Sequence, residues 1–195
     1  MNISLIFANN ISLIFANELI TRAFGNQGKL PWQFIKEDMQ FFQKTTENSV
    51  VVMGLNTWRS LPKMKKLGRD FIVISSTITE HEVLNNNIQI FKSFESFLEA
   101  FRDTTKPINV IGGVGLLSEA IEHASTVYMS SIHMVKPVHA DVYVPVELMN
   151  KLYSDFKYPE NILWVGDPID SVYSLSIDKF VRPASLVGVP NDINT

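Results

Sequence analysis

One acidic side chain, Asp38, stands out among the residues that could do chemistry. It lies in GNQGKLPWQFIKEDMQFFQ (residues 25–43), where a loop with two glycines leads into a predicted helix. Ile35, Met39 and Phe42 form one apolar stripe on that helix, and Asp38 projects from the same side. Burying a carboxylate among aromatic side chains is costly unless a partner pairs with it. The pattern is therefore equally consistent with a carboxylate bonded to nearby backbone and with one that binds adjacent N–H donors of a ligand.

A second candidate feature is a buried strand that runs directly into a short helix in VVVMGLNTWRSLP (residues 50–62). Gly54 occupies the junction, and Thr57 lies in the first helical turn, where free backbone N–H groups and the helix dipole favour phosphate. Glycine and threonine are also ordinary residues of turns and helix caps. Taken alone, this segment predicts a turn and no more.

The same order of strand, glycine and helix recurs in INVIGGVGLLSEAIE (residues 108–122). Glycines at such a turn let the backbone approach a pyrophosphate at a helix N-terminus. The spacing differs from the G-x-G-x-x-G fingerprint, so the turn alone is a weak signal. Arg69, just before a predicted strand, carries a planar guanidinium that suits a carboxylate, although most surface arginines are only solvated.

The elements that must position these residues are β-rich apolar runs alternating with amphipathic helices. Several runs are continuously apolar, as expected for strands covered on both faces. Near the end, NILWVG and SVYSLSID flank a turn and predict an antiparallel hairpin. We predict an α/β fold with a mainly parallel central sheet flanked by helices and an antiparallel C-terminal hairpin strand. The predicted strands are residues 49–54, 70–76, 88–91, 107–112 and 125–132, and the predicted helices are residues 35–46, 56–61, 94–103 and 113–122.

The composition excludes several classes of protein. The chain has 195 residues, of which 46% are hydrophobic and 19% charged, which indicates one globular domain. A formal net charge of −3 argues against a nucleic-acid partner, and the absence of cysteine excludes disulfides and thiolate metal sites. No apolar run approaches the roughly 20 residues that a membrane helix needs. We expect a cytoplasmic protein without a metal or membrane partner, and a monomer, with a homodimer as the alternative.

The motifs together resemble the dihydrofolate reductase family, from about Ile11 to Phe180. The order is SLI, LPW, an acid on the next helix, MG-x-x-TW, GR, VIGG and a late ADVYVP. Each motif is weak alone, and their order over one domain length makes the resemblance specific. The resemblance implies that fold and NADPH-dependent reduction of 7,8-dihydrofolate to tetrahydrofolate for one-carbon and thymidylate metabolism. Hydride would go to pterin C6, and Asp38 would promote protonation of N5.

The resemblance also implies a role for each matching residue. Asp38 would bind the pterin 2-amino group and N3–H, Arg69 would grip the glutamate α-carboxylate, and Asp141 would support the loop Gly25–Leu30. The Gly112–Gly113 peptide would be cis. The implied catalytic residues are Asp38, Trp32 and Leu30. The implied substrate-binding residues are Ile14, Met39, Phe42, Leu61, Arg69, Ile111 and Ser130. The implied NADPH-binding residues are Gly25, Gly54, Asn56, Thr57, Ile74, Ser75, Ser76, Gly112, Gly113, Gly115 and Leu116.

The N-terminus contains the octapeptide NISLIFAN twice in succession, as residues 2–9 and 10–17. Each copy has the pattern of one buried strand. The family spacing between Ser12 and Trp32 assigns the second copy to the fold. We therefore expect a domain over residues 10–183, a duplicated extension over residues 1–9 and a flexible tail over residues 184–195.

Two departures and two alternatives accompany the resemblance. Leu55 stands where relatives often carry Arg or Lys against the 2′-phosphate, so we expect a weaker preference for NADPH over NADH. Leu117 stands where many members have Tyr near the nicotinamide. One alternative is a reductase of the same fold that acts on a ribosylated pyrimidine in riboflavin synthesis, which would not require LPW followed by a buried acid. The other is a non-catalytic binding or structural module of this fold.

Overall fold

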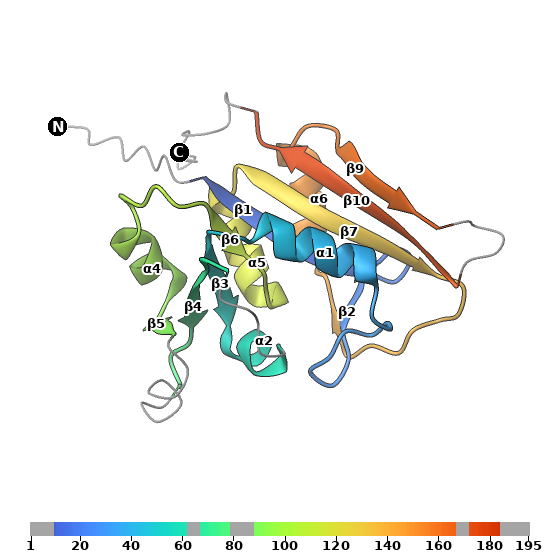
Figure 1. Ribbon diagram of the computed structural model, residues 1–195, viewed down its shortest axis with the longest axis horizontal. Helices are drawn as coiled ribbons and strands as arrows, with labels where there is room; N and C mark the ends of the chain where they lie inside the picture. Colours follow the sequence, from blue (N-terminus) through green and yellow to red (C-terminus); the bar gives the residue numbers. More distant parts are fainter. Residues whose placement is uncertain (1–9, 62–66, 79–87, 167–171, 184–195) are drawn as a thin grey trace, which may run out of the picture.

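The computed structural model describes residues 10–61, 67–78, 88–166 and 172–183. Its centre is an eight-stranded sheet in the order β5-β4-β3-β6-β1-β7-β10-β9 (Figure 1). Neighbours from β5 to β7 are parallel, whereas β10 is antiparallel to β7 and β9, so the predicted fold class is confirmed. The strands are β1 (Ile11–Glu18), β3 (Val50–Gly54), β4 (Asp70–Ile74), β5 (Gln89–Phe91), β6 (Ile108–Val110), β7 (Thr126–Met134), β9 (Glu160–Val165) and β10 (Tyr173–Val181).

The second copy of the octapeptide forms most of the central strand β1, between β6 and β7. Its side chains alternate between the two faces of the sheet, as the period of a strand requires. Leu13 and Phe15 join the core on one face, and Ile14 joins a cluster on the other. The second copy is thus the strand, as predicted, and residues 1–9 lie outside the described residues.

Helices cover both faces of the sheet (Figure 1). Helices α1 (Lys36–Thr45) and α2 (Leu55–Ser60) carry apolar side chains into the clusters on one face. On the other face, α4 (Phe94–Ala100), α5 (Val114–Ala120) and α6 (Val146–Asp155) build the largest cluster, and a 3-10 turn at Ile121–His123 follows α5.

Each predicted helix is present, but α6 was not predicted. It begins after Pro145 with no side-chain cap, and only Leu148 and Leu152 are fully buried, four residues apart. Two buried residues make too short an apolar stripe to distinguish this helix from a loop in the sequence.

A second, two-stranded sheet pairs β2 (Ala23–Gly25) with β8 (Val142–Tyr143). Both strands are too short to be recognised from a period of two, and neither was predicted. The pairing holds the base of the loop that follows Gly25. Asp141 donates its backbone N–H to the Gly25 carbonyl (3.0 Å) and accepts the Gln27 N–H on Oδ2 (2.9 Å), which is the contact that the resemblance implied.

The topology brings the C-terminal ends of β1, β3 and β6 to one edge of the sheet. These three strands are adjacent and parallel, and α2 and α5 follow β3 and β6 there. In open α/β sheets, ligands bind beyond the C-terminal ends of the strands, where free helix N-termini also gather. This edge of the sheet is therefore the expected place of the functional site.

Candidate active site

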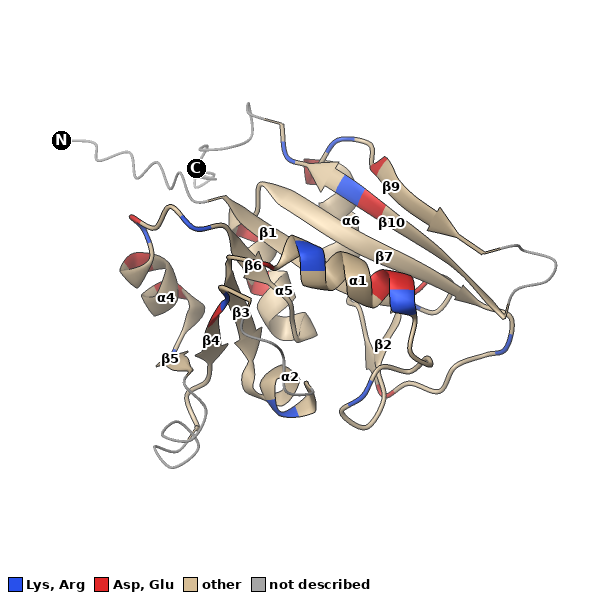
Figure 2. Ribbon diagram, in the orientation of Figure 1, with Lys and Arg blue, Asp and Glu red and all other residues tan. Residues whose placement is uncertain are grey.

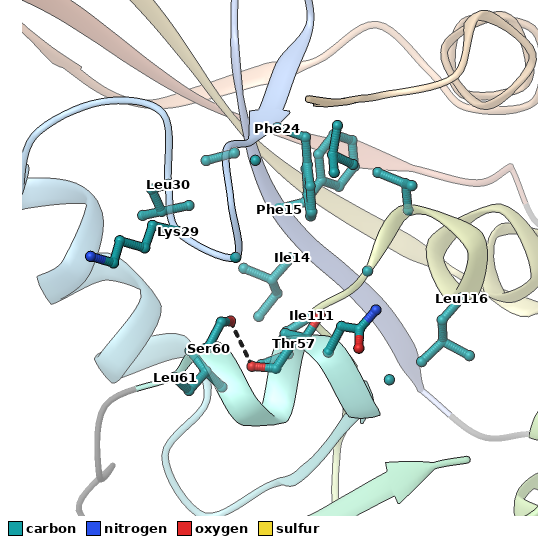
Figure 3. Close-up of a pocket in the computed structure, with 18 of the residues that line it drawn as sticks. Ile14, Phe15, Phe24, Lys29, Leu30, Thr57, Ser60, Leu61, Ile111 and Leu116 are labelled. Atoms are coloured by element: carbon teal, nitrogen blue, oxygen red, sulfur yellow. Dashed lines mark hydrogen bonds between the residues drawn. The ribbon is translucent and has the colours of Figure 1, made fainter. Parts of the chain in front are cut away.

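A cavity of about 890 Å³ opens at this edge. Its walls come from β1, from β2 and the loop after it, from α1 and α2, from the end of β4, and from α5, β7 and β8. Figure 3 shows Ile14 near the middle of the view, with Leu30 and Lys29 on one side and Thr57, Ser60 and Leu61 on another. The cavity is large enough for a ligand of drug or cofactor size.

Asp38 reaches the cavity from the first turn of α1. Figure 2 shows this acidic turn as the red segment at the start of the helix. Its Oδ1 accepts a 2.6 Å hydrogen bond from the Ser130 hydroxyl on β7. Burial raises the pKa of the Asp38 carboxyl above its usual value, and the Ser130 hydrogen bond lowers it in part. The adjacent Glu37 does not line the cavity, and its Oε2 accepts the Tyr173 hydroxyl at 3.3 Å. The helix register predicted from the apolar stripe is therefore confirmed.

Apolar side chains surround this carboxyl. Ile14 and Ile111 belong to one buried cluster, against which Phe42 and Leu61 pack. All four line the cavity. A planar ligand held against these walls could present its polar edge to Asp38. This arrangement combines a partly buried carboxyl with apolar walls.

The glycine turns before α2 and α5 form a second region of the cavity wall, in which backbone N–H groups supply the polar contacts. Gly54 and Gly113 are the N-caps of α2 and α5, and neither helix start has a side-chain cap. The Gly54 N–H donates to the Gly112 carbonyl (2.8 Å), and the Gly112–Gly113 peptide is cis, as the resemblance implied. A Cβ built on Gly113 would meet only Thr57 Oγ1, at 3.5 Å, and one on Gly115 would meet nothing within 4 Å. Backbone N–H groups at this turn are thus open to a ligand in the cavity.

Most of the residues chosen from the sequence meet in this cavity. Those that line it are Ile14, Gly25, Leu30, Asp38, Met39, Phe42, Gly54, Asn56, Thr57, Leu61, Ile74, Ile111, Gly113, Gly115, Leu116 and Ser130. Those that do not are Trp32, Arg69, Ser75, Ser76 and Gly112.

The residues outside the cavity wall have identifiable positions. Trp32 is buried in a cluster with Ile35 and Leu175. Arg69 is also buried, and its guanidinium donates to the Gln43 and Thr46 carbonyls at the end of α1. The structure thus gives this guanidinium contacts with the end of α1, and the predicted contact with a ligand stays a prediction.

Many residues of the cavity wall were not predicted from the sequence. Most of them reach the wall because the surrounding fold brings them there, and their residue types give no sign of it. Lys29 belongs to the loop, and Phe15 and Ala16 follow Ile14 on β1 after the strand passes the cavity floor. Leu55 was noted only as a departure. The wall residues outside the predicted set are Phe15, Ala16, Phe24, Gly28, Lys29, Phe41, Leu55, Arg59, Ser60, Thr77, Val114, Glu119 and Val142.

The charged side chains on the wall are mixed in sign, with Lys29 and Arg59 basic and Asp38 and Glu119 acidic. Within the described ranges, no group of three or more His, Asp or Glu side chains could hold a metal ion. None of the described helices is long and apolar enough to span a membrane. The site offers a ligand one partly buried carboxyl, apolar walls and the backbone N–H groups of the glycine turn.

The fold and site define a class of protein: an α/β protein whose ligand cavity lies at the C-terminal ends of parallel strands, with two helix N-termini and a partly buried acid on its wall. Residues 10–161, more than half of the chain, match the family model described as dihydrofolate reductase. The chain belongs to the dihydrofolate reductase family.

Individual relatives agree with this placement. The chain is 27% identical over 169 residues to the dihydrofolate reductase of Pneumocystis carinii, which covers 75% of this chain and 82% of that protein. It is 28% identical over 135 residues to the bifunctional dihydrofolate reductase-thymidylate synthase of Paramecium tetraurelia, covering 69% of this chain but 27% of that longer protein. The dihydrofolate reductase of Enterococcus faecalis, solved with NADP(H) and RAB-propyl, has a TM-score of 0.68 at 24% identity and covers 88% of this chain and 95% of that chain. This last likeness supports the fold.

Proposed function

We propose that this chain is an NADPH-dependent dihydrofolate reductase, which reduces 7,8-dihydrofolate to tetrahydrofolate. The observation on which the proposal rests is the Asp38 carboxyl, which lies partly buried in the cavity wall and accepts a hydrogen bond from Ser130. Family membership supplies the substrate class, and the carboxyl supplies the group that the reaction requires from the protein. The product would feed one-carbon and thymidylate metabolism.

The residues present fit a dinucleotide cofactor. Open space beside Gly113 and Gly115 lets a pyrophosphate approach the start of α5, and Thr57 can donate its hydroxyl from α2. When bound, NADPH supplies the hydride. The proposed cofactor-binding residues are those of the sequence prediction, and those at the cavity wall are Gly25, Gly54, Asn56, Thr57, Ile74, Gly113, Gly115 and Leu116.

Asp38 would act on the pterin in two ways. Its two oxygens can accept the N3–H and the 2-amino group, which fixes the ring in one orientation. Its raised pKa brings protonation closer to neutral pH, so a proton for N5 can be held at this end of the site. Ser130 holds the carboxyl in place, since its hydroxyl donates to Oδ1. Ile14, Ile111 and Phe42 exclude water from the reacting carbon.

The proposed roles of the remaining predicted residues follow from their positions. Leu30, at the end of the loop, would close the cavity mouth, and Trp32 would anchor that loop through its buried ring. Arg69 would hold the glutamate α-carboxylate of the substrate. We also propose that the protein acts as a monomer in the cytoplasm, with the domain over residues 10–183.

A direct assay tests the proposal. Purified chain is mixed with NADPH and dihydrofolate, and the loss of NADPH absorbance is followed with and without the folate. We expect oxidation that depends on dihydrofolate. No oxidation by a folded sample, as judged by its circular dichroism, would support the non-catalytic module. Oxidation that requires a ribosylated aminopyrimidine in place of dihydrofolate would support the reductase of riboflavin synthesis.

A further inference from the structure

The position of β1 between β6 and β7 is filled by a sequence that the chain contains twice. Residues 2–9 repeat residues 10–17 without a difference, and the repeat ends where Asn10 aligns with Glu18. Strand β1 pairs with β6 at Ile11, Ser12 and Leu13 and with β7 from Ser12 to Glu18. Every one of these contacts except that of Glu18 could be made by the first copy in the same place.

Burial of apolar side chains does not distinguish the two choices. The first copy would bring Ile3, Leu5, Ile6 and Phe7 to the places of Ile11, Leu13, Ile14 and Phe15. In either arrangement one octapeptide fills the position and the other does not, so the buried apolar area of the octapeptide is the same. The interactions that select the second copy must lie beyond the repeat.

Glu18 makes the interactions that differ. Its Oε2 accepts the backbone N–H of Ile20 (3.1 Å), the backbone N–H of Thr21 (2.7 Å) and the Thr21 hydroxyl (2.7 Å). This carboxylate closes the tight turn between β1 and β2. Asn10 in the same place has a shorter side chain and a neutral oxygen, and Leu13 would replace Thr21 three residues later.

The connection to β2 also differs. In the observed arrangement residues 19–22 join β1 to β2, whereas the alternative would use residues 11–22. Lengthening a flexible connection threefold lowers the probability of closing it by roughly fivefold. This effect and the loss of the Glu18 turn are small compared with unfolding the sheet.

We propose that the position between β6 and β7 binds either octapeptide, so that the chain has two strand registers eight residues apart, with Glu18 selecting the observed one. Ile6, Phe7 and Ala8 would then replace Ile14, Phe15 and Ala16 at the cavity wall without changing its chemistry. The loop that begins at Gly25 would be joined to β1 by a longer connection, so the cavity would keep its walls while β1 and β2 would lose the tight turn between them.

The edges of the same sheet do not offer the first copy an equivalent place. Strands are spaced about 4.8 Å apart, so the open side of β9 lies four spacings, or about 19 Å, from β1. Eight extended residues span about 26 Å, which leaves about two residues for pairing. The open side of β5 is one spacing farther away.

Aspartate substitutions in the full chain test the proposal. Leu13 is completely buried in β1, so an aspartate there prevents the second copy from filling the position. We expect Leu13→Asp to remain folded, with a cooperative thermal transition, because the first copy replaces the second. Leu5→Asp should also fold, whereas the double variant Leu5→Asp/Leu13→Asp should not. An unfolded Leu13→Asp variant, indistinguishable from the double variant, would overturn the proposal.

Thiol labelling tests it without such a disruptive change, since the chain has no cysteine of its own. A cysteine that replaces Leu13 is protected in the observed register and becomes accessible in the other. We expect Leu13→Cys to be labelled at least about tenfold faster than Leu5→Asp/Leu13→Cys, because local exchange requires less opening than unfolding. Adding Glu18→Asn to Leu13→Cys should increase the rate further. Equal labelling rates in all three proteins would contradict the two registers. These measurements do not depend on the proposed activity.

Discussion

Replacing Asp38 by asparagine separates the contribution of this carboxyl to turnover from its effect on folding. Asparagine has nearly the same volume, and its Oδ1 can still accept the Ser130 hydroxyl. The variant loses the negative charge that pairs with the pterin N–H groups and the proton that the acid delivers. Positioned acid catalysis contributes about 10²–10⁴-fold, which corresponds to about 2.7–5.4 kcal/mol of barrier. We expect kcat with dihydrofolate at neutral pH to fall by at least the lower figure.

The rate of the variant should increase as the pH falls, because protons from solvent then replace the missing acid. Glu37→Gln is the matched control: Glu37 accepts from Tyr173 outside the cavity, and a glutamine oxygen can accept the same hydroxyl. Steady-state kinetics from pH 5 to 8 measure both variants. If Glu37→Gln lost turnover and Asp38→Asn did not, the assignment of the acid would be refuted.

The same substitution should stabilise the ligand-free protein at neutral pH. Burial raises the folded-state pKa of Asp38 above its unfolded value, so its contribution to stability is present below the unfolded pKa and is lost as pH rises through the folded pKa. Asparagine carries no such penalty. The Tm of Asp38→Asn should therefore exceed that of the natural protein at pH 7, and the difference should vanish in acid. A lower Tm for the variant at pH 7 would show that the ionised carboxyl is satisfied in the apo fold.

Further predictions concern the cofactor region and the partner of Asp38. Leu55→Arg should improve kcat/KM for NADPH, but not for NADH, by about 1.5–3 kcal/mol of charge-assisted binding, and a strong NADPH preference in the natural protein would contradict this reasoning. Gly112→Ala should lower the stability by about 1–3 kcal/mol in denaturant titration, because Gly112 has a φ of +128° and its Cβ would lie 3.2 Å from the Phe24 ring. Ser130→Ala removes the hydrogen bond that lowers the Asp38 pKa, so the pKa in the pH–rate profile should rise.

The sequence predicts the buried strands well, because strands covered on both faces leave long apolar runs that few other structures require. Val50–Met53 are completely buried and were recognised for this reason. The elements that were missed lack such a run. Helix α6 fully buries two residues, and β2 and β8 are held by pairing partners more than 100 residues away in the chain. Long-range pairing of short strands has no local signal.

The residues of the site also fall into those that the sequence could predict and those that it could not. Asp38 could be found because helical period alone places it beside Met39 and Phe42 on one face. Its partner Ser130 is 92 residues away, and only the pairing of β7 with β1 brings it to the same wall. Periodicity says nothing about that contact, and the resemblance gave Ser130 only as a substrate-binding residue, not as the partner of Asp38. Side chains that line the cavity from loops, such as Lys29, were missed because loop geometry is set by the surrounding fold.

Arg69 makes contacts with the end of α1 that the sequence did not predict, and a substitution there distinguishes this structural role from the predicted role in substrate binding. The Arg69 Nε donates to the Thr46 carbonyl (3.2 Å) and hydroxyl (2.9 Å), and Nη2 donates to the Gln43 carbonyl (2.7 Å). Lysine keeps the charge but cannot reproduce this fork, so Arg69→Lys should lower the free energy of unfolding by about 1.5–3 kcal/mol.

A role of Arg69 in substrate binding would also change KM for dihydrofolate, and a loss of stability alone would not produce this change. If Arg69 also holds the glutamate α-carboxylate, Arg69→Lys should raise KM for dihydrofolate but not for a dihydropterin that lacks the glutamate. Both substrates should respond alike if the arginine only fastens the end of α1 to the start of β4. The ratio of the two kcat/KM values is therefore the decisive measurement, because any loosening of α1 displaces Asp38 equally for both pterins and cancels in that ratio.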